Sequence, residues 1–372
     1  MIIVMKADVA ADSPELKRVI ALAESYPGIT TQLHRIQGAS RSVTEVYLLG
    51  PTGVVPSAPF EEFEAVEKVV RVTQSFRAIG RHDGGMEAVG FQYNGVQVSQ
   101  DRLLVFAGLC AIDNLENVEK TFRVLKDLGI VTTRAGAYKP RSSPYDFQGL
   151  GAKCLPWVFE AAGKYGIRII TMEVTHEQHI GEIQRALEAS GRATGVMLQI
   201  GTRNAQNFEL LKAVGQQTEL PVLFKRGMGI TLEESLNACE YVASSGNRQI
   251  VFCLRGMKTN LGDPHRNFVD FAHVPVVKRL TRLPVGIDPS HSVGRRTVGP
   301  DGLLDIFHVT AQGVIAGANM VLVDVHPQPE KALCDGPQAL LLEELPAFVE
   351  DVAIVRRAYE ERRSRRDASP SS

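Results

Sequence analysis

Three cations fall within eight residues at the start of RAGAYKPRSSPYDFQGLG, which spans residues 134 to 151. They are Arg134, Lys139 and Arg141, and the aromatic residues Tyr145 and Phe147 follow them among prolines and glycines. Repulsion between neighbouring cations costs free energy unless anions are bound, and Arg and Lys are the usual partners of phosphate and carboxylate oxygens. This turn-rich stretch therefore predicts a local anion-binding site.

More cations follow apolar segments later in the chain. They are Arg203, Lys225, Arg226, Arg255, Arg295 and Arg296. Any single one of them is more often a surface ion pair than a ligand contact. A phosphate monoester carries roughly −1.5 to −2 charges, so this many cations exceed what one phosphate needs. Two phosphates and a carboxylate account for the set better.

A second group of residues has the chemistry of a metal site: Cys110, His291, Asp324 and Asp335. A thiolate, an imidazole and two carboxylates suit Mn²⁺, Fe²⁺, Co²⁺ or Zn²⁺ better than Mg²⁺, which prefers oxygen ligands. The alternative is an inert core thiol and a hydrogen-bonded turn histidine, because neither HxxxH nor CxxC marks a site. The remaining cysteines are assigned to packing: Cys154, Cys239, Cys253 and Cys334.

The elements that must position these residues are eight short apolar runs separated by amphipathic helical segments. This is the pattern of a parallel sheet covered by helices, and eight repeats in about 250 residues predict an α/β fold, a (β/α)8 TIM barrel. An open doubly wound sheet is the alternative, but its GxGxxG turn is absent. The expected strands span residues 103–108, 131–136, 168–174, 195–201, 221–227, 249–256, 283–290 and 320–326.

Barrel enzymes place their active sites on the loops that follow the strands, and both groups of residues occupy such positions. Strands 8 and 1 are neighbours once a barrel closes, so Asp324 and Cys110 are expected to meet. Leu322, Asp324 and His326 share one face of strand 8, which directs the carboxylate inward.

The first 80 residues have a different pattern, a βαββαβ order that predicts a small α+β, ferredoxin-like domain. Its strands are expected at 2–6, 30–36, 43–50 and 72–79, and its helices at 13–26 and 60–70. We therefore expect four parts: a ferredoxin-like domain (1–80), a linker with a hairpin at Asn94-Gly95 (81–101), the catalytic barrel (102–360) and a disordered tail (361–372).

Composition excludes several functions. The chain has 372 residues, 41 basic and 42 acidic, and a formal charge of −1, so it has no global field to attract nucleic acid or a membrane surface. Its five scattered cysteines argue against a disulfide framework and favour a reducing cytoplasm. No apolar run approaches the roughly 20 residues of a membrane span.

Several long motifs resemble one family, the 3-deoxy-D-arabino-heptulosonate 7-phosphate (DAHP) synthases of the type I beta branch, which has an N-terminal ferredoxin-like domain. The matching stretches are RAGAYKPRSSPYDFQGLG, QIGTRNAQNFELL, FKRGMGITLEE, DPSHSVGRR and VDVHPQPEKALCDGPQAL. The resemblance implies a transferase of the shikimate pathway of aromatic amino acid biosynthesis. Such an enzyme condenses phosphoenolpyruvate with erythrose 4-phosphate, releases inorganic phosphate and depends on a divalent metal.

The resemblance also implies roles for single residues. Arg134, Lys139, Arg203, Lys225 and Arg255 match positions that hold phosphoenolpyruvate, and Lys139, Pro140, Arg141 and Ser142 match the turn that meets the aldose phosphate. Cys110, His291, Asp324 and Asp335 match the metal ligands. Lys139, Cys110 and His291 are the expected catalytic residues, with Lys139 as the proton donor to the developing alkoxide. A homo-oligomer, a tetramer or a dimer, and an aromatic amino acid effector are implied as well.

The sequence departs from the family pattern near the metal and the aldehyde. Leu109 and Ala111 replace the Pro and Ser of G-P-C-S, Asp324 replaces a Glu, and Leu254 and residues 257–260 differ in the sixth loop. Two alternatives stay open, and the first of them follows from these changes. One is a paralogue of specialised metabolism that condenses phosphoenolpyruvate with a different aldehyde, and the other is a non-catalytic, ligand-sensing homologue.

Overall fold

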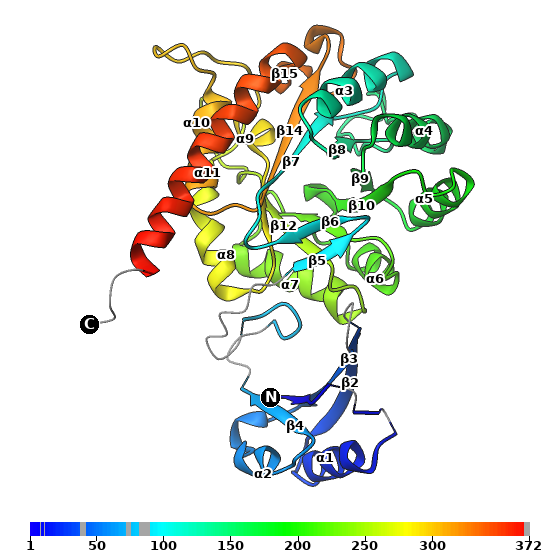
Figure 1. The fold of residues 1–372 in the computed structure, drawn as a ribbon, viewed down its shortest axis with the longest axis vertical. Helices are drawn as coiled ribbons and strands as arrows, with labels where there is room; N and C mark the ends of the chain where they lie inside the picture. The colour runs from blue at the N-terminus through cyan, green and yellow to red at the C-terminus, as the bar shows by residue number, and fades with distance from the viewer. Residues whose placement is uncertain (8, 11, 38–41, 72–75, 82–89, 368–372) are drawn as a thin grey trace. The chain divides into compact units, whose positions relative to one another are not determined.

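The computed structural model of the chain describes all residues except 8, 11, 38–41, 72–75, 82–89 and 368–372 (Figure 1). The chain divides into two compact units, residues 1–86 and residues 87–372. Each unit has its own sheet and its own buried core, and each is described separately below.

The N-terminal unit is a four-stranded antiparallel sheet with a helix packed on one face. Its elements are β1 (Ile2–Met5), α1 (Pro14–Glu24), β2 (Thr30–Gln37), β3 (Ser42–Leu49), α2 (Ala58–Glu61) and β4 (Val66–Val70). The strand order is β2-β3-β1-β4, with β1 pairing antiparallel to both β3 and β4. The predicted small α+β domain is therefore confirmed.

The expected helix at 60–70 is wrong. Only the single turn of α2 is helical, and Val66–Val70 is the fourth strand, in the region where the helix was expected. Phe60, Phe63 and Val66 recur every three residues, which imitates a helical period, but β1 offers an open edge that pairs with the β-branched segment. Of the strand expected at 72–79, residues 72–75 lie outside the described part of the chain.

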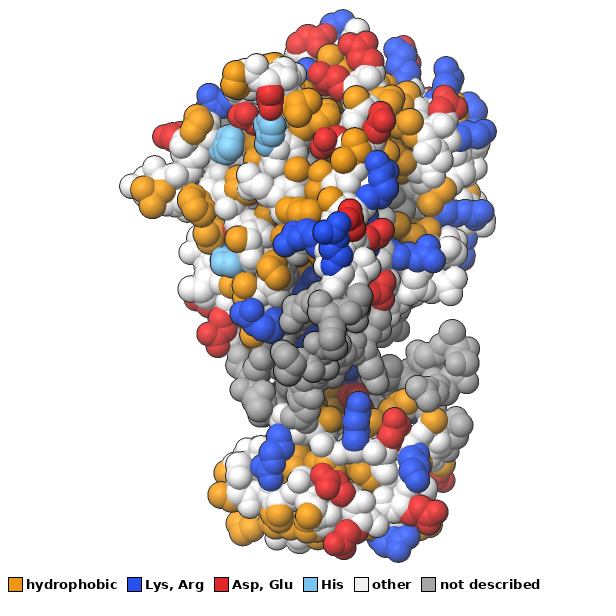
Figure 2. All heavy atoms as spheres, turned by 60° about the vertical axis from the view of Figure 1, so that its left-hand side comes forward, with side chains coloured by type: hydrophobic (Ala, Val, Ile, Leu, Met, Phe, Trp, Pro, Cys, Tyr) orange, Lys and Arg blue, Asp and Glu red, His pale blue; other side chains and the backbone are white. Residues whose placement is uncertain are grey.

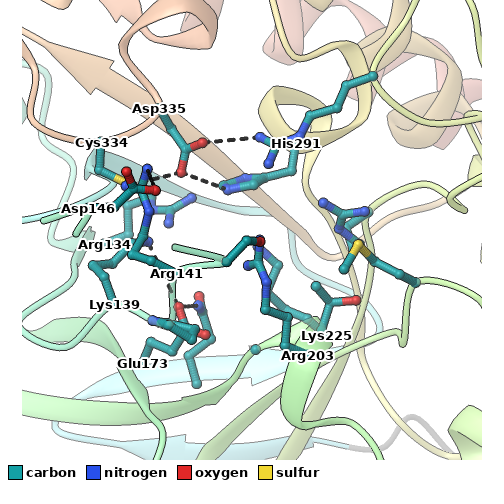
Figure 3. A pocket seen from close by; sticks show the side chains of 18 residues that line it. Arg134, Lys139, Arg141, Asp146, Glu173, Arg203, Lys225, His291, Cys334 and Asp335 are labelled. Atoms are coloured by element: carbon teal, nitrogen blue, oxygen red, sulfur yellow. Dashed lines mark hydrogen bonds and ion pairs between the residues drawn. The ribbon is translucent and has the colours of Figure 1, made fainter. Parts of the chain in front are cut away.

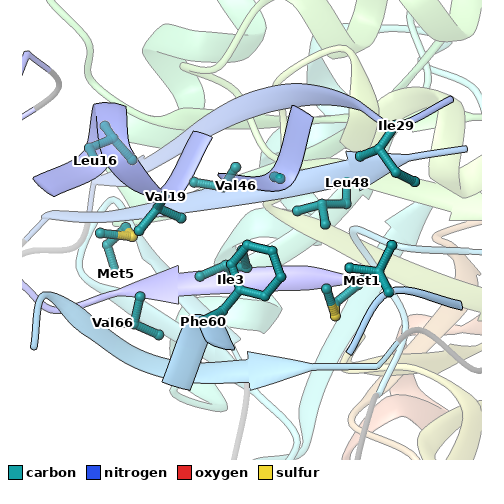
Figure 4. Packing of buried hydrophobic residues seen from close by; sticks show 12 residues of the cluster. Met1, Ile3, Met5, Leu16, Val19, Ile29, Val46, Leu48, Phe60 and Val66 are labelled. Atoms are coloured by element: carbon teal, nitrogen blue, oxygen red, sulfur yellow. The ribbon is translucent and has the colours of Figure 1, made fainter. Parts of the chain in front are cut away.

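The core of this unit lies between α1 and the sheet (Figure 4). Alternate residues of β1 point to the helix side, in keeping with the period of two along a strand. Ser13 caps the N-terminus of helix α1, because its side chain accepts a hydrogen bond from the backbone N–H of Leu16 (3.2 Å). Pro14 occupies the first turn of the helix. The cluster includes Ile3, Met5, Leu16, Val19, Val46, Leu48 and Phe60.

The second unit is a closed barrel of eight parallel strands, as predicted. The strands are β7 (Leu104–Leu109), β8 (Thr132–Ala135), β9 (Ile169–Val174), β10 (Gly195–Ile200), β11 (Val222–Lys225), β12 (Ile250–Leu254), β13 (Val285–Ile287) and β14 (Met320–His326). Neighbours pair in sequence order, and the pairings of β14 with both β7 and β13 close the ring. The strands are buried along most of their length, as expected for a sheet covered by helices.

Helices surround this ring (Figure 1). They are α3 (Leu115–Asp127), α4 (Leu155–Tyr165), α5 (Gln178–Ala189), α6 (Phe208–Gln216), α7 (Leu232–Ser244), α8 (Val274–Leu280), α9 (Pro289–Val293), α10 (Asp305–Ile315) and α11 (Leu345–Asp367). Amphipathic spacing positions them: Val118, Phe122 and Leu125 of α3 are buried on one face. Helix α11 packs against α10, where the rings of Phe307 and Phe348 meet edge to face at 5.3 Å.

A hairpin closes the N-terminal end of the barrel. It consists of β5 (Gly90–Tyr93) and β6 (Val96–Ser99), and its turn residues Asn94 and Gly95 have positive φ angles of 44° and 79°, as a tight hairpin turn requires. Val96 and Val98 pack against inward-facing strand residues such as Phe106 and Leu322. Apolar side chains thus fill this end of the barrel, and the opposite end carries the polar groups.

The tail is helical for longer than expected. Helix α11 continues to Asp367, so residues 361–367 are not the disordered segment that their composition indicated; residues 368–372 lie outside the described part. Arg365 pairs with Glu361 one turn earlier, which supports an exposed helix. On the face shown in Figure 2, Lys and Arg side chains are interspersed with Asp and Glu. Among the described residues, no helix is long and apolar enough to cross a membrane.

Candidate active site

A cavity of about 220 Å³ opens at the C-terminal end of the barrel, where the expected substrate-binding residues line it (Figure 3). Its walls come from the ends of the strands and the loops that follow them. Seven cations line the cavity: Arg134, Lys139, Arg141, Arg203, Lys225, Arg255 and Arg266. Asp146, Glu173 and Asp335 are the acidic residues of the lining. The excess of positive charge gives this cavity the electrostatic character that favours anions.

Three of the buried cations are held by buried carboxylates. Arg134 forms an ion pair with Asp324, and Lys225 forms one with Asp288. Lys139 Nζ lies 3.8 Å from Glu173 Oε2. These pairs fix the side chains at the ends of β8 and β11 and in the loop after β8, so the cations are oriented before any substrate binds.

Arg255 differs from these cations. Its side chain is 2% exposed, and among the described residues its Nε has no hydrogen-bond partner and its NH1 donates to the carbonyl of Gly256 at 3.4 Å. Burial lowers the pKa of this guanidinium. A buried cation with an unsatisfied donor beside a cavity is costly unless an anion completes its hydrogen bonds. Arg255 is thus the strongest single indication of a bound anion here.

The turn after β8 forms the outer side of the cavity. Pro140, Arg141 and Ser142 all line it, and Arg141 NH2 donates to Asp146 Oδ2 at 3.2 Å. Arg203, in the loop after β10, also lines the cavity and is exposed. Beneath that loop, Gly201 leaves room for a carboxylate, because a Cβ there would lie 1.8 Å from Glu173 Oε1. The lining therefore combines a buried inner part with an exposed outer part.

The four expected metal ligands meet at one side of the cavity. Cys110 Sγ lies 3.9 Å from His291 Nε2 and 3.1 Å from Asp335 Oδ2, and His291 Nε2 lies 3.6 Å from the same carboxylate oxygen. Asp324 Oδ2 is 3.7 Å from His291 Nδ1. A thiol, an imidazole and carboxylates from three different loops and a strand converge within a few ångströms, so the donor set fits a divalent transition metal.

A surrounding set of hydrogen bonds orients these ligands. His291 Nδ1 lies 2.9 Å from Asp288 Oδ2, which leaves Nε2 directed at Cys110 and Asp335. Gln338 Nε2 donates to Asp324 Oδ2 at 2.6 Å, and Arg266 NH1 donates to Asp335 Oδ1 at 3.1 Å. Such outer partners of metal ligands hold ring orientation and tautomer in metalloproteins.

The charges in this cluster perturb one another. Burial lowers the pKa of His291, but the carboxylates of Asp288 and Asp324 outweigh it and raise this pKa to about 10. Burial raises the pKa of Asp335, whereas His291 and Lys139 lower it further, and the net shift is downward. Burial also lowers the pKa of Lys139, but Cys110 and Glu173 raise it overall, so Lys139 keeps its proton at neutral pH.

Some residues singled out from the sequence lie outside the cavity lining. Arg226 pairs with Asp270 (2.9 Å), and Arg296 pairs with Glu344 through both of its terminal nitrogens. Leu254 is buried in β12 and does not line the cavity, so this departure from the family pattern does not itself contact a substrate there. Leu109 is likewise buried in its strand.

Sequence reasoning missed Cys334, Asp288, Gln338 and Arg266 as members of the site. Cys334 is buried against Cys110 and Ala111, in keeping with the expected packing role, and its sulfur also lies among the metal-ligand candidates. Its position directly before Asp335 was the available signal. Asp288 could have been predicted, because it follows the end of a strand and lies three residues before His291. Gln338 and Arg266 reach the site from loops, and no sequence motif marks them.

An eight-stranded barrel with an anion-binding cavity and a metal-ligand cluster at its C-terminal end defines a barrel enzyme. The chain belongs to the DAHP synthetase I family, whose model matches residues 88–359. A phospho-2-dehydro-3-deoxyheptonate aldolase of Thermotoga maritima is 36% identical, over 95% of this chain and 96% of its own length. Enzymes of the DAHP synthetase I family form carbon–carbon bonds. The predicted family is therefore confirmed, and so is the prediction that the chain is an enzyme.

The other relatives differ in how much of this chain they match. A 2-dehydro-3-deoxyphosphooctonate aldolase of Syntrophobacter fumaroxidans is 27% identical over 75% of this chain and 96% of its own length. A crystal structure of DAHP synthase from Thermotoga maritima matches 96% of this chain and 97% of that chain, with a TM-score of 0.68 and 35% identity. A truncated form of 3-deoxy-D-arabino-heptulosonate 7-phosphate synthase from the same organism matches 77% of this chain and 98% of that chain (TM-score 0.65, 33% identity). Both units of this chain are thus present in a heptonate-type relative.

Proposed function

We propose that this chain condenses phosphoenolpyruvate with erythrose 4-phosphate and water to give 3-deoxy-D-arabino-heptulosonate 7-phosphate and inorganic phosphate. C3 of the enol forms a bond with the aldehyde carbon, water adds at C2, and the phosphate group leaves. The observation that carries the proposal is the cavity with seven cations beside the Cys110 cluster. The heptonate aldolase matches both units of this chain, whereas the octonate aldolase matches 75% of it. This difference supports the proposed reaction over that of an octonate aldolase.

The buried cations are proposed to hold phosphoenolpyruvate. Arg134, Lys139, Lys225 and Arg255 line the inner cavity, and Arg203 completes the set from the loop after β10. A phosphate and a carboxylate on one small molecule match paired guanidinium and ammonium donors. Arg255 has a buried Nε without a hydrogen-bond partner among the described residues, so substrate binding offsets an electrostatic cost there.

The outer turn is proposed to hold the aldose phosphate. Pro140, Arg141 and Ser142 follow Lys139 directly, so one turn contacts both substrates and brings the enol carbon toward the aldehyde. Lys139 is proposed as the proton donor to the new alkoxide, because it keeps its proton at neutral pH and its Nζ lies 3.1 Å from Cys110 Sγ.

Cys110, His291, Asp324 and Asp335 are proposed to hold a divalent metal, which can be Mn²⁺, Fe²⁺, Co²⁺ or Zn²⁺. When bound, such an ion supplies Lewis-acid polarisation of the aldehyde oxygen. The residues of the chain orient that site: Asp288 fixes the His291 ring, and Gln338 fixes the Asp324 carboxylate.

Product formation tests the proposal. The purified chain is supplied with phosphoenolpyruvate and one aldehyde at a time, with Mn²⁺ or Co²⁺, and both phosphate release and the sugar acid are measured. Turnover with erythrose 4-phosphate well above that with arabinose 5-phosphate, lost on chelation and restored by metal, is the expected result. Turnover with another aldehyde only, or none with any, contradicts it.

Three further properties implied by the family are proposed, for the N-terminal unit, the assembly and the location of the enzyme. We propose that this unit binds an aromatic amino acid that inhibits the barrel, that the chain forms a homotetramer or dimer, and that the enzyme works in the cytoplasm. Inhibition assays with phenylalanine and tyrosine, together with sedimentation of the full chain, test the first two; unaffected turnover or a monomer contradicts them.

A further inference from the structure

Cys334 places a second sulfur beside the proposed metal ligands. The residue lies in the loop after β14, is 8% exposed, and its Sγ donates to Asp335 Oδ2 at 3.1 Å. Cys110 Sγ donates to the same oxygen, also at 3.1 Å. The donor atoms of Cys110, Cys334 and Asp335 all lie within 4.8 Å of one another; Figure 3 shows Cys334 and Asp335 at the cavity. Two thiols therefore share one carboxylate oxygen.

We propose that Cys334 is a further ligand of the divalent metal, so that this site offers two thiolates and selects a soft ion, Zn²⁺ or Co²⁺, over Mn²⁺. The inference rests on the metal site of the proposed function and adds a ligand to it. Thiolate donors favour zinc and related ions, whereas carboxylate and water ligands suit manganese and magnesium. When the bond to the metal forms, the Cys334 thiol releases its proton to solvent.

The second carboxylate of the cluster is already engaged by the protein. Asp324 forms an ion pair with Arg134 through Oδ1 and accepts a hydrogen bond from Gln338 through Oδ2 at 2.6 Å. Protein groups therefore contact both oxygens of Asp324 and restrict the rotation of this carboxylate. Cys334 Sγ, in contrast, donates to the neighbouring Asp335 and lies beside Cys110, so these contacts keep its sulfur within the cluster.

The surroundings also compensate the charge of a second thiolate. Arg134 NH2 lies 3.3 Å from Cys110 Sγ, and Lys139 Nζ lies 3.1 Å from it. Arg266 NH1 donates to Asp335 Oδ1 at 3.1 Å. Buried anions require such partners, and three cations next to two thiolates and a carboxylate provide them.

Cobalt absorption of the full chain tests the proposal. A thiolate bound to Co²⁺ gives sulfur-to-metal charge-transfer absorption, and its intensity rises with the number of sulfur ligands. We expect Cys334→Ser and Cys110→Ser each to retain about half of the wild-type intensity, and the double variant to lose it, because each change removes one of two soft ligands. Cys239→Ala, in the buried face of α7, is the matched control and retains the full intensity.

A measurement on the unmodified protein covers the case in which a variant misfolds. Zinc-edge X-ray absorption of the wild-type chain counts sulfur neighbours directly, at about 2.3 Å. Two sulfurs support the proposal. One sulfur, or a cobalt spectrum that Cys334→Ser leaves unchanged, overturns the proposal while the four-ligand site stands. Absence of metal-bound sulfur in the wild type overturns the metal site itself.

Competition between metals supplies the selectivity readout. The wild type and Cys334→Ser are equilibrated with equal Zn²⁺ and Mn²⁺, and the bound metals are measured by elemental analysis. We expect the ratio of bound zinc to manganese to fall by about tenfold or more in Cys334→Ser, comparable to the loss of an outer metal-site partner. An equal ratio in both proteins contradicts the selective role of Cys334.

Discussion

Lys139 Nζ lies 3.1 Å from Cys110 Sγ, so the proposed proton donor touches the proposed metal ligand. Replacing this ammonium by an apolar chain of similar length, Lys139→Met, removes the donor and leaves the cluster in place. We expect turnover to fall by about 10²- to 10⁴-fold, the usual contribution of general acid catalysis, and to fall by more than any accompanying loss of bound metal. Steady-state kinetics and elemental analysis measure both.

Lys153→Met is the control for this change, since Lys153 is exposed in the segment before α4 and does not line the cavity. Full turnover in Lys139→Met with an intact fold removes the proposed role.

Arg255→Met separates anion binding from folding. The guanidinium is buried with an unsatisfied Nε, so an apolar replacement relieves a desolvation cost in the ligand-free protein. We expect ligand-free thermal stability to be unchanged or raised, and the affinity for phosphoenolpyruvate, measured by calorimetry, to fall at least about tenfold because charged hydrogen bonds are lost. Arg279→Met, an exposed residue of α8, is the comparison and retains affinity. Equal affinity in Arg255→Met argues against the assignment.

Asp288→Asn tests the support of His291. A neutral amide holds the Nδ1–H of the His291 ring less strongly than the carboxylate does. The ring tautomer and orientation that direct Nε2 at the cluster are therefore less stable. Metal affinity is expected to fall by about 10- to 100-fold in equilibrium dialysis. Asp301→Asn is the matched control, because Asp301 pairs with His308 at 3.0 Å in an exposed position remote from the cavity lining. Equal losses in both variants indicate a general effect of the substitution and contradict the specific role.

The pH dependence of the metal-free protein follows from His291. Its folded-state pKa is raised to about 10 by Asp288 and Asp324 against the effect of burial, whereas the unfolded value is about 6.5. The resulting stabilisation is fully present below about pH 6.5 and is lost as the pH rises through about 10. The free energy of unfolding of the wild type, relative to His291→Asn, is therefore expected to decline over this interval in denaturant titrations. A rising difference contradicts the ion-pair geometry.

The ion pair of Arg296 with Glu344 holds the segment that carries Asp335 and Gln338. Both N–O distances are 2.6 Å, and Arg296 NH1 also donates to Ala339 O at 3.1 Å. We expect Arg296→Gln to lower the free energy of unfolding by about 1–2 kcal/mol, since a bidentate charged pair is lost, and to weaken metal binding. Arg192→Gln, at an exposed pair with Glu188, is expected to change stability by less than about 0.5 kcal/mol. Unchanged metal binding in Arg296→Gln removes the positioning role.

Local patterns in the chain predicted much of the fold. Eight buried, β-branched runs with amphipathic helices between them predict the barrel, because such runs are stable only when both faces are covered. The failure at β4 shows the limit: apolar residues spaced by three predict a helix, whereas Val66–Val70 pairs with the open edge of β1 as a strand. The helix also extends to Asp367, and Arg362 and Arg363 of this extension contact Ile315 and Asp101, which composition does not report.

By itself, the sequence determined the types of the chemical groups and the strand ends that carry them: Arg134, Lys139, Cys110, His291 and Asp324. Only the tertiary structure decided which of these groups touch. It left Arg226 and Arg296 outside the cavity lining and brought Cys334, Gln338 and Arg266 to the metal-ligand cluster. The physical reason is that closing the ring fixes contacts between loops far apart in the chain, and no local spacing encodes such contacts.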